Sequence, residues 1–292
     1  MKEAHASPTN QSELLARAVA GDKQALEDLL LSVQDMIFNL SLRMLGTIPD
    51  AEDASQEILV RVMTGLSSFR GESAFSTWVF RIAANHLQNY RKSMFAQHPL
   101  SFELYGQDIS CGKERDVPDL TQGVDRKLLE DELKYSCTNV MLQCFDPESR
   151  CIYILGTMFH IDSRIAGEIL GMTPEAYRQR LSRIRRKMAE FLKEYCGLSG
   201  TGSCRCSRRV NYAIATHRLD PQKQEYSGLG TLAPGQLTEF KNAMEEMDGY
   251  STFFSGLPAY RSPDKLQALL MEILNSRAAA VVCSAPAEEG TE

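Results

Sequence analysis

The chain has 292 residues, of which 43% are hydrophobic and 24% are charged, and its formal net charge is −6. This composition is ordinary for a water-soluble protein, and no apolar run approaches the roughly 18 residues of a membrane-spanning helix. The polar N-terminus lacks the apolar segment of a secretion signal, so we expect a cytoplasmic protein with more than one domain, reduced cysteines and no membrane partner.

Apolar residues recur at spacings of three and four along almost the whole chain, which predicts an all-α fold. Residues 1–10 are expected to form a disordered leader. Asp22 can cap a helix that ends near Gly46, and an acidic helix is predicted to follow. The start of that helix, from Asp50 to Glu57, holds four acidic residues and no basic residue. Such a local charge favours a basic partner.

The stretch FSTWVFRIAANHLQNYRK, from Phe75 to Lys92, is predicted to form one amphipathic helix. On a helical wheel, one set of its side chains faces the core and another forms a polar stripe. The core set is Phe75, Trp78, Val79, Ile82 and His86, and the polar stripe is Thr77, Arg81, Asn85, Gln88 and Lys92. By itself this pattern favours an ordinary core helix with a solvated outer face, in which Trp78 is a packing residue.

Helical periodicity is lost across residues 96–125, where glycines and prolines are spread among polar residues. We therefore predict a linker over this range. The helical pattern returns near Arg126. Asp146 is expected to cap a further helix that starts at Pro147.

The segment HIDSRIAGEILGMTPEAYRQRLSRIRRKM has the anatomy of a helix-turn-helix. Asp162 can cap its first helix, Gly171 supplies the turn, and Thr173 can cap its second helix. Between Pro174 and Tyr195 the second helix carries seven basic and three acidic residues. A helix of this charge can enter the major groove of DNA and contact bases and phosphates.

The outward side chains of this second helix are the candidates for DNA contact. Arg178, Gln179 and Ser182 are candidates for base contacts, because Arg pairs with guanine edges and Gln with adenine. The candidates for phosphate contacts are Arg180, Arg183, Arg185, Arg186 and Lys187, and Glu175 lies on the same outward face. The residues expected to face the core are Tyr177, Leu181, Ile184 and Met188. The alternative interpretation is a solvated basic helix that only packs on its neighbours.

Two motifs resemble one bacterial protein family, in the family's order. The run DAEDASQEILVRVMTGLSSFRGESAFSTWVFRIAANHLQNYRK resembles region 2 of extracytoplasmic-function (ECF) RNA polymerase sigma factors. The later run DSRIAGEILGMTPEAYRQRLSRIRRKM resembles region 4 of the same family. The resemblance implies region 2 at residues 11–95, a flexible linker at 96–125 and region 4 at 126–196.

The resemblance also implies partners and roles. The chain would bind core RNA polymerase, through its β′ clamp and β flap, and promoter DNA; an anti-sigma factor is left open, and no cofactor or metal is expected. The residues implied to dock on the β′ clamp are Asp50, Glu52, Asp53, Gln56 and Glu57. Those implied to contact the minus-ten element are Trp78, Arg81, Asn85, Gln88, Asn89, Tyr90, Arg91 and Lys92. Those implied to contact the minus-thirty-five element are Glu175, Arg178, Gln179, Arg180, Ser182, Arg183, Arg186 and Lys187.

The chain departs from the family pattern at several positions. Trp78 occupies the place of the first aromatic of the strand-separating pair in primary sigma factors, but Val79 follows it. Promoter melting is therefore expected to depend strongly on a good promoter. Ser163 and Arg164 stand where the family often has an acidic pair, and Tyr177 replaces a small aliphatic residue. These departures leave the base preference open.

Residues 197–292 form a C-terminal extension beyond the family pattern. Cys204 and Cys206, with Cys196 and His217, could bind zinc or sense oxidants, although Cys-x-Cys is a poor match to the usual Cys-x-x-Cys pairs. The alternative is a helical appendage that packs on the sigma regions and restrains them, through Phe253, Phe254, Leu257 and Leu266. Helices are predicted from Pro234 to about Asp248 and from Pro263 to about Arg277, followed by a disordered tail.

The leading functional hypothesis is a sigma factor without catalytic activity, which binds core polymerase, recognises the promoter and promotes transcription initiation. The alternative is a helix-turn-helix transcriptional regulator that acts without core polymerase. A third hypothesis is an enzyme with a DNA-binding tail. The sequence has no phosphate-binding glycine loop, nucleophile elbow or convincing metal-ligand cluster to support that third hypothesis.

Overall fold

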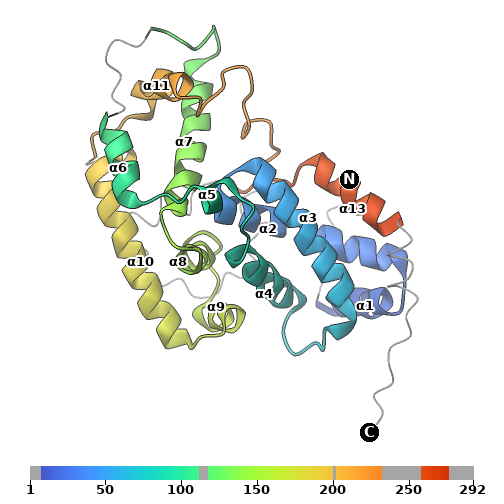
Figure 1. Cartoon of the computed structure of the whole chain (residues 1–292). Coiled ribbons are helices and arrows are strands. Elements are labelled where there is room, and N and C mark those ends of the chain that lie inside the picture. Colours follow the sequence, from blue (N-terminus) through green and yellow to red (C-terminus); the bar gives the residue numbers. More distant parts are fainter. Residues whose placement is uncertain (1–7, 112–117, 200–201, 232–257, 276–292) are drawn as a thin grey trace.

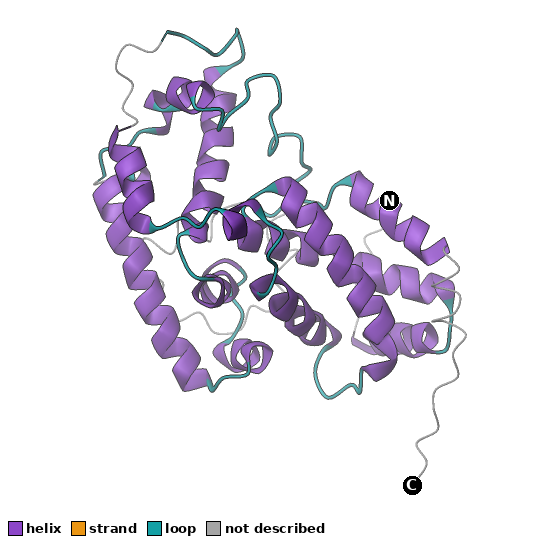
Figure 2. Cartoon of the chain, in the orientation of Figure 1, coloured by secondary structure: helices purple, strands orange, loops and turns teal. Residues whose placement is uncertain are grey.

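The computed structural model describes residues 8–111, 118–199, 202–231 and 258–275, and its regular structure is helical (Figures 1 and 2). These ranges contain no β-strand, and their isolated β-bridges pair Cys196 with Cys204 and Thr231 with Tyr260. The all-α prediction is confirmed. No helix within these ranges is both long and apolar enough to cross a membrane.

Four helices make up the N-terminal part. They are α1 (Pro8–Val19), α2 (Lys23–Leu45), α3 (Ile48–Gly65) and α4 (Phe75–Gln88), with the 3-10 turn η1 (Leu66–Ser68) after α3. Helix α1 begins inside the stretch predicted as a disordered leader, so that prediction is wrong from Pro8 onward. Asp22 caps α2 by accepting hydrogen bonds from two backbone amides, as predicted. Gly46 ends α2 with φ of 87°, a left-handed conformation that glycine adopts readily.

Helix α4 is shorter than predicted, and its buried face is different. It ends at Gln88, so the predicted last turn, Asn89 to Lys92, lies beyond the helix. Thr77, which the wheel placed on the polar stripe, is only 3% exposed, whereas Trp78 is only partly buried. The reason is that α4 contacts α8 (Pro147–Tyr153) and α9 (Ser163–Leu170) as well as α2 and α3, so more than one stripe of its surface is covered. Its buried residues are Phe75, Thr77, Val79, Phe80, Ala83, Ala84 and Leu87.

The predicted linker contains a packed helix. Two short helices follow α4, namely α5 (Met94–Gln97), which begins just before the predicted linker, and α6 (Phe102–Cys111), which lies within it. In α6, Tyr105 and Ile109 are buried, and the Phe102 ring lies 5.0 Å from the Phe191 ring of α10. The prediction that this stretch lacks helical periodicity is therefore wrong, because Phe102, Tyr105 and Ile109 recur at helical spacing within otherwise polar sequence.

The following helices agree with the predicted boundaries. They are α7 (Arg126–Gln143), α8 (Pro147–Tyr153), the π-helical turn η2 (Ile154–Met158), α9 (Ser163–Leu170) and α10 (Pro174–Tyr195). The predicted caps Asp146, Asp162 and Thr173 each accept a hydrogen bond from the first turn of their helix. Gly171 makes the turn between α9 and α10 with φ of 67°. The predicted helix-turn-helix is confirmed.

The described part of the extension adds short helices. They are η3 (Gly197–Ser199), η4 (Cys206–Arg208), α11 (Val210–Ala215) and α13 (Asp264–Asn275). Helix α13 matches the helix predicted from Pro263, and its Leu266 is buried as the appendage alternative requires. The helix predicted from Pro234, the predicted packing residues Phe253, Phe254 and Leu257, and the tail lie outside the described residues.

Most buried side chains belong to one continuous core, from Ala18 in α1 to Leu274 in α13, and a smaller cluster joins Leu129 and Leu133 of α7 to Val210, Ala213 and Leu219. Arg150 in α8 connects α2 with α7. Its guanidinium donates to the backbone carbonyl of Met44 at the end of α2 and to three carbonyls at the end of α7 and just after it. Burial lowers the pKa of Arg150 to about 10, which leaves it charged at neutral pH. One buried cation thus caps two helices from different regions.

Replacing Arg150 with Met should lower the free energy of unfolding by about 3 kcal/mol, because four buried carbonyls each lose one donor while the apolar stem is retained. Thermal and urea unfolding monitored by circular dichroism measure the change. Arg164→Met removes an exposed arginine that pairs with Asp162 near the surface and should cost less than about 1 kcal/mol. Equal stability of the two variants would contradict the capping role.

Candidate nucleic-acid and polymerase interfaces

On the acidic helix α3, one predicted docking residue is exposed to solvent and others contact residues of the same chain. Asp53 is exposed and Gln56 is partly exposed. The Asp50 carboxylate accepts from the Thr47 hydroxyl at 2.7 Å and from the Met94 amide at 3.2 Å. Glu52 lies 3.6 Å from the Lys265 ammonium of α13, and its side chain is 17% exposed. Asp53 is therefore the most accessible acid for a basic partner.

Glu57, the last predicted docking residue, faces the end of α4 instead. Lys92 donates to its carboxylate at 2.7 Å, and this hydrogen bond lowers the pKa of Glu57. His86 lies 3.5 Å away on the other oxygen. The pKa of His86 is lowered, chiefly by burial and by the charge of Arg61, so His86 is neutral at pH 7. Lys92, proposed from sequence to contact DNA, is thus paired within the chain.

An open groove of about 770 Å³ runs between the second half of α3 and the end of α4. It brings together five of the predicted minus-ten residues, namely Asn85, Asn89, Tyr90, Arg91 and Lys92. Asn85, Asn89 and Arg91 are exposed, whereas Tyr90 is buried with its ring beside His86. Gln88 does not line this groove. The groove also contains Arg61, which the sequence interpretation missed although it follows Glu57 by one helical turn.

Trp78 lies outside this groove and packs against other aromatic rings. Its ring centroid is 5.4 Å from that of Phe69 and 5.8 Å from that of Phe75. Gly65 lies beside the indole, where an added Cβ would be 3.5 Å from the ring. In this arrangement Trp78 is a half-buried packing residue, as the helical wheel indicated.

Arg81 of α4 is paired with the helix-turn-helix. Its guanidinium lies 2.7 Å from the carboxylate of Glu168 in α9, with both side chains about 40% exposed (41% and 44%). Phe80 of α4 also contacts Phe159 edge to face at 5.6 Å. Helix α4 and the helix-turn-helix are therefore packed together. Glu168 was missed from sequence because nothing local relates it to a residue 87 positions away.

Helix α10, the second helix of the helix-turn-helix, has an exposed face and a face that contacts the rest of the protein. Five predicted DNA-contacting residues line a shallow surface groove, namely Arg178, Gln179, Ser182, Arg183 and Arg186. Arg178 also donates to Ser163 at 3.1 Å and to Glu175 at 3.1 Å. Gln179, Ser182, Arg183 and Arg186 are exposed. These side chains form a continuous polar surface with a positive charge.

Three other basic residues of α10 are engaged with the protein. Arg180 lies 2.5 Å from Glu148 of α8, and Arg185 donates to Thr157 and to the Gly156 carbonyl. Lys187 lies over the Phe102 ring at 5.0 Å. In this arrangement these three residues position α10 on α8, η2 and α6.

Four cysteines line a narrow cavity of about 20 Å³ between α7 and the extension: Cys137, Cys196, Cys204 and Cys206. Burial raises the pKa of Cys206 to about 11 and that of Cys137 to about 12. These thiols are therefore protonated at neutral pH, which makes them slow to oxidise. His217 does not line this cavity. The described ranges contain no group of three or more His, Cys, Asp or Glu placed to hold a metal ion.

Comparison with known proteins adds a family relationship. Residues 29–94 match the family model "Sigma-70 region 2". The chain is 30% identical over 122 residues to RNA polymerase sigma-H factor of Pseudomonas aeruginosa, covering 42% of this chain and 63% of the relative. It is 27% identical over 174 residues to ECF RNA polymerase sigma factor SigW of Bacillus subtilis, covering 60% and 92%. It is 35% identical over 88 residues to ECF RNA polymerase sigma-E factor of Escherichia coli, covering 30% and 46%. The chain thus spans less than two thirds of the first and third of these relatives.

The close approach of α10 to Gly156 gives a stability prediction. A Cβ added at Gly156 would lie 2.5 Å from Leu181 and 2.6 Å from the Tyr177 hydroxyl, so Gly156→Ala should displace α10 and cost about 2 kcal/mol. Gly65→Ala is the matched control, because its nearest neighbour would be at an ordinary 3.5 Å. Thermal unfolding compares them. An unchanged melting temperature in Gly156→Ala would show that α10 does not depend on this close approach.

Proposed function

Because the chain carries a sigma-70 region 2 domain and belongs with the ECF RNA polymerase sigma factors, we propose that it binds core RNA polymerase and directs it to promoters. The observation that carries the proposal is the combination of this domain with a helix-turn-helix in one chain. No catalytic step is assigned to the chain. Its partners are core polymerase and promoter DNA in the cytoplasm, and an anti-sigma factor is not required for this role.

The minus-ten element is proposed to bind at the end of α4. The exposed amides of Asn85 and Asn89 and the guanidinium of Arg91 line an open groove that can take a nucleotide out of the base stack. Arg81 adds a cation beside this groove once its pairing with Glu168 is broken. Single-stranded DNA is favoured here because the groove offers both hydrogen bonds for base edges and charge for phosphates.

The minus-thirty-five element is proposed to bind the open face of α10. Arg178, Gln179 and Ser182 occupy the first turns of the helix, where base edges are reached in a helix-turn-helix. Arg183 and Arg186 lie further along and suit phosphate contacts. Because Arg180, Arg185 and Lys187 are engaged with the protein, we assign them to positioning the helix rather than to DNA.

Core polymerase is proposed to bind the acidic side of α3, with Asp53 as the central contact to the β′ clamp. Asp50 shapes the start of the helix through its hydrogen bonds, and Gln56 supplies a neighbouring polar contact. A second contact, from residues 126–196 to the β flap, follows from the family relationship. Reconstitution with core polymerase tests the proposal: specific transcripts from a matching promoter support it. Protection of duplex promoter without core would instead favour a regulator that acts alone.

Arg81→Ala and Asn85→Ala should each slow open-complex formation about tenfold while leaving core affinity near that of the unmodified chain, since each removes one DNA contact. Permanganate footprinting of the melted region measures the rate. Glu168→Ala is the matched control, because it breaks the same ion pair as Arg81→Ala but keeps the arginine. If Glu168→Ala also slowed opening, Arg81 would act through the ion pair and not through DNA.

Asp53→Arg should weaken core binding at least tenfold, about 1.4 kcal/mol, because it places a like charge against a basic partner. Fluorescence titration of labelled protein with core polymerase gives the dissociation constant. Asp28→Arg on α2 makes the same charge change at another exposed acid and should leave binding unchanged. Equal affinities for the two variants would argue against docking through α3.

A further inference from the structure

The extension joins both sigma regions at one buried polar junction. Arg43 of α2 donates to Asn139 of α7 at 2.7 Å and to the Pro258 carbonyl of the extension at 2.6 Å. Asn139 in turn donates to the Tyr226 hydroxyl at 2.9 Å. Arg43 is 3% exposed, its guanidinium lies 5.6 Å from the Tyr260 ring centroid, and its pKa is lowered by burial. Region 2, region 4 and the extension therefore meet at a single buried cation.

The extension is also attached directly to region 2. The Asn39 side chain, inside α2, donates to the Tyr260 carbonyl and accepts from the Tyr260 amide, at 2.5 and 2.8 Å. Asp35, one turn earlier, accepts from the amide and hydroxyl of Ser262, both at 2.7 Å. Helix α13 then lies along α2 and α3, as Figure 1 shows, with three buried leucines and with Lys265 near Glu52. The buried leucines are Leu266, Leu270 and Leu274.

Region 4 holds the extension through a buried carboxylate. Glu132 of α7 is 4% exposed and has no cation as a hydrogen-bond partner among the contacts of the described residues. Instead it accepts from the backbone amides of Glu225, Tyr226 and Ser227 at 2.5 to 3.1 Å, and from the Ser227 hydroxyl at 2.7 Å. Four donors satisfy one carboxylate, which fixes this segment on α7.

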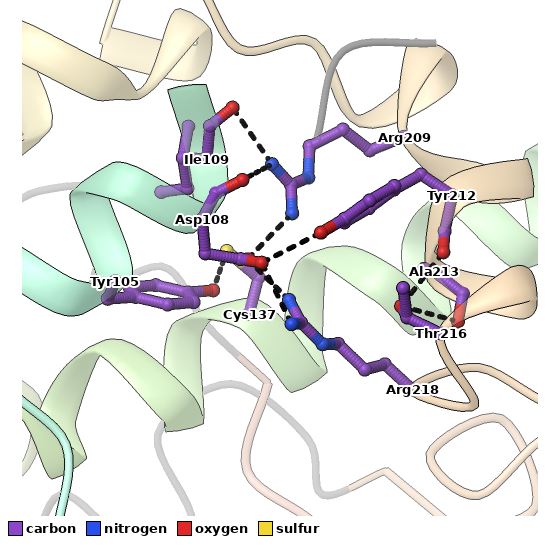
Figure 3. Close-up of polar contacts among 9 residues, drawn as sticks. All are labelled: Tyr105, Asp108, Ile109, Cys137, Arg209, Tyr212, Ala213, Thr216 and Arg218. Carbon is purple, nitrogen blue, oxygen red and sulfur yellow. Dashed lines mark hydrogen bonds and ion pairs between the residues drawn. The ribbon is translucent and has the colours of Figure 1, made fainter. Parts of the chain in front are cut away.

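A third attachment is to α6, between the two regions (Figure 3). Asp108 accepts from Arg209 at 3.0 Å and from the Tyr212 hydroxyl at 2.9 Å, and it is bridged by both terminal nitrogens of Arg218. Burial alone would raise the pKa of Asp108, but the hydrogen bonds from Arg218 and Tyr212 outweigh it and the pKa is lowered. Asp108 is thus ionised and bound on three sides by the extension.

These attachments maintain an arrangement in which two residues of the proposed interfaces, Arg81 and Glu52, are engaged within the chain. While α2 and α3 are tied to α6 and α7, α4 lies against α8 and α9, Arg81 is paired with Glu168, and α13 lies beside the docking helix at Glu52. The minus-ten and minus-thirty-five elements are separate stretches of DNA, so binding both is incompatible with the DNA-contacting Arg81 facing the helix-turn-helix. The hydrogen-bond acceptors of Arg43 within the described ranges are neutral, so separating the regions breaks no ion pair there and returns the cation to water.

We propose that the C-terminal extension, residues 202–231 with 258–275, is an internal inhibitor that holds the two sigma regions together until it is displaced. The proposal rests on the proposed function. The extension would then restrain the two sigma regions from within the same chain, as a separate inhibitory protein could do from outside it. Displacement of both parts of the extension would free Arg81 for DNA and Glu52 for core polymerase, because α13 would leave α3 and the two regions could separate.

A pair of substitutions on α13 tests this in the full chain. Leu270→Asp places a carboxylate on the buried face of α13 and should release the helix, whereas Gln267→Asp introduces the same side chain on the exposed face. For Leu270→Asp we expect a larger radius of gyration of the free protein by X-ray scattering. We also expect transcript yield with core polymerase on a matching promoter to rise on the order of fivefold. Gln267→Asp should match the unmodified chain in both.

Asn39→Leu provides a second release variant that leaves α13 intact. Leucine keeps a side chain at this position of α2 but cannot make either hydrogen bond to the Tyr260 backbone. This variant should therefore also show a larger radius of gyration and a higher transcript yield. If both release variants retain their helical circular dichroism but show unmodified size and transcript yield, the inhibitory role is overturned and the sigma function stands. If neither they nor the unmodified chain bind core polymerase, the proposed function fails and the inhibitory role fails with it.

Discussion

The arrangement of this molecule depends on two buried guanidinium groups whose hydrogen-bond partners, among the described residues, are neutral oxygens and not carboxylates. Arg150 and Arg43 are satisfied by carbonyl and amide oxygens at places where α2 meets α7 and α8. Neutral acceptors hold a cation less tightly than a carboxylate would, yet they orient it through several directed hydrogen bonds. The position of α2 relative to α7 and α8, and therefore which faces of α4 and α10 are open, follows from these contacts.

The two proposed DNA surfaces differ in how much they must rearrange before they can bind DNA. The open face of α10 is already assembled, since Arg180, Arg185 and Lys187 fix the helix and leave Gln179, Ser182 and Arg183 in solvent. The surface of α4 is divided: its groove is open at Asn85 and Asn89, but Arg81 is paired across the regions. Duplex recognition thus needs less rearrangement than recognition of a melted strand.

Local sequence signals predicted local structure well. Asp22, Asp146, Asp162 and Thr173 cap the predicted helices because capping depends only on neighbouring residues. The failures involve distant residues. Thr77 is buried because α8 and α9 cover a face of α4 that a helical wheel assigns to solvent. Helix α6 packs because α10 supplies an aromatic surface for it. The pairing of Arg81 with Glu168, and the ties of Asp108 and Glu132 to the extension, join residues between 87 and 110 positions apart, a separation at which periodicity carries no information.

The manner in which Asn39 and Glu132 bind the extension has a consequence for its evolution. Both recognise main-chain groups, of Tyr260 and of residues 225–227, so the side chains at those positions are largely free to change without loss of the contact. The selective constraint falls on the two residues that bind the main chain, the amide of Asn39 in α2 and the carboxylate of Glu132 in α7. Relatives of this chain could therefore diverge widely in their final hundred or so residues while preserving the same attachment, and a search for that attachment would do better to follow positions 39 and 132 than the extension itself.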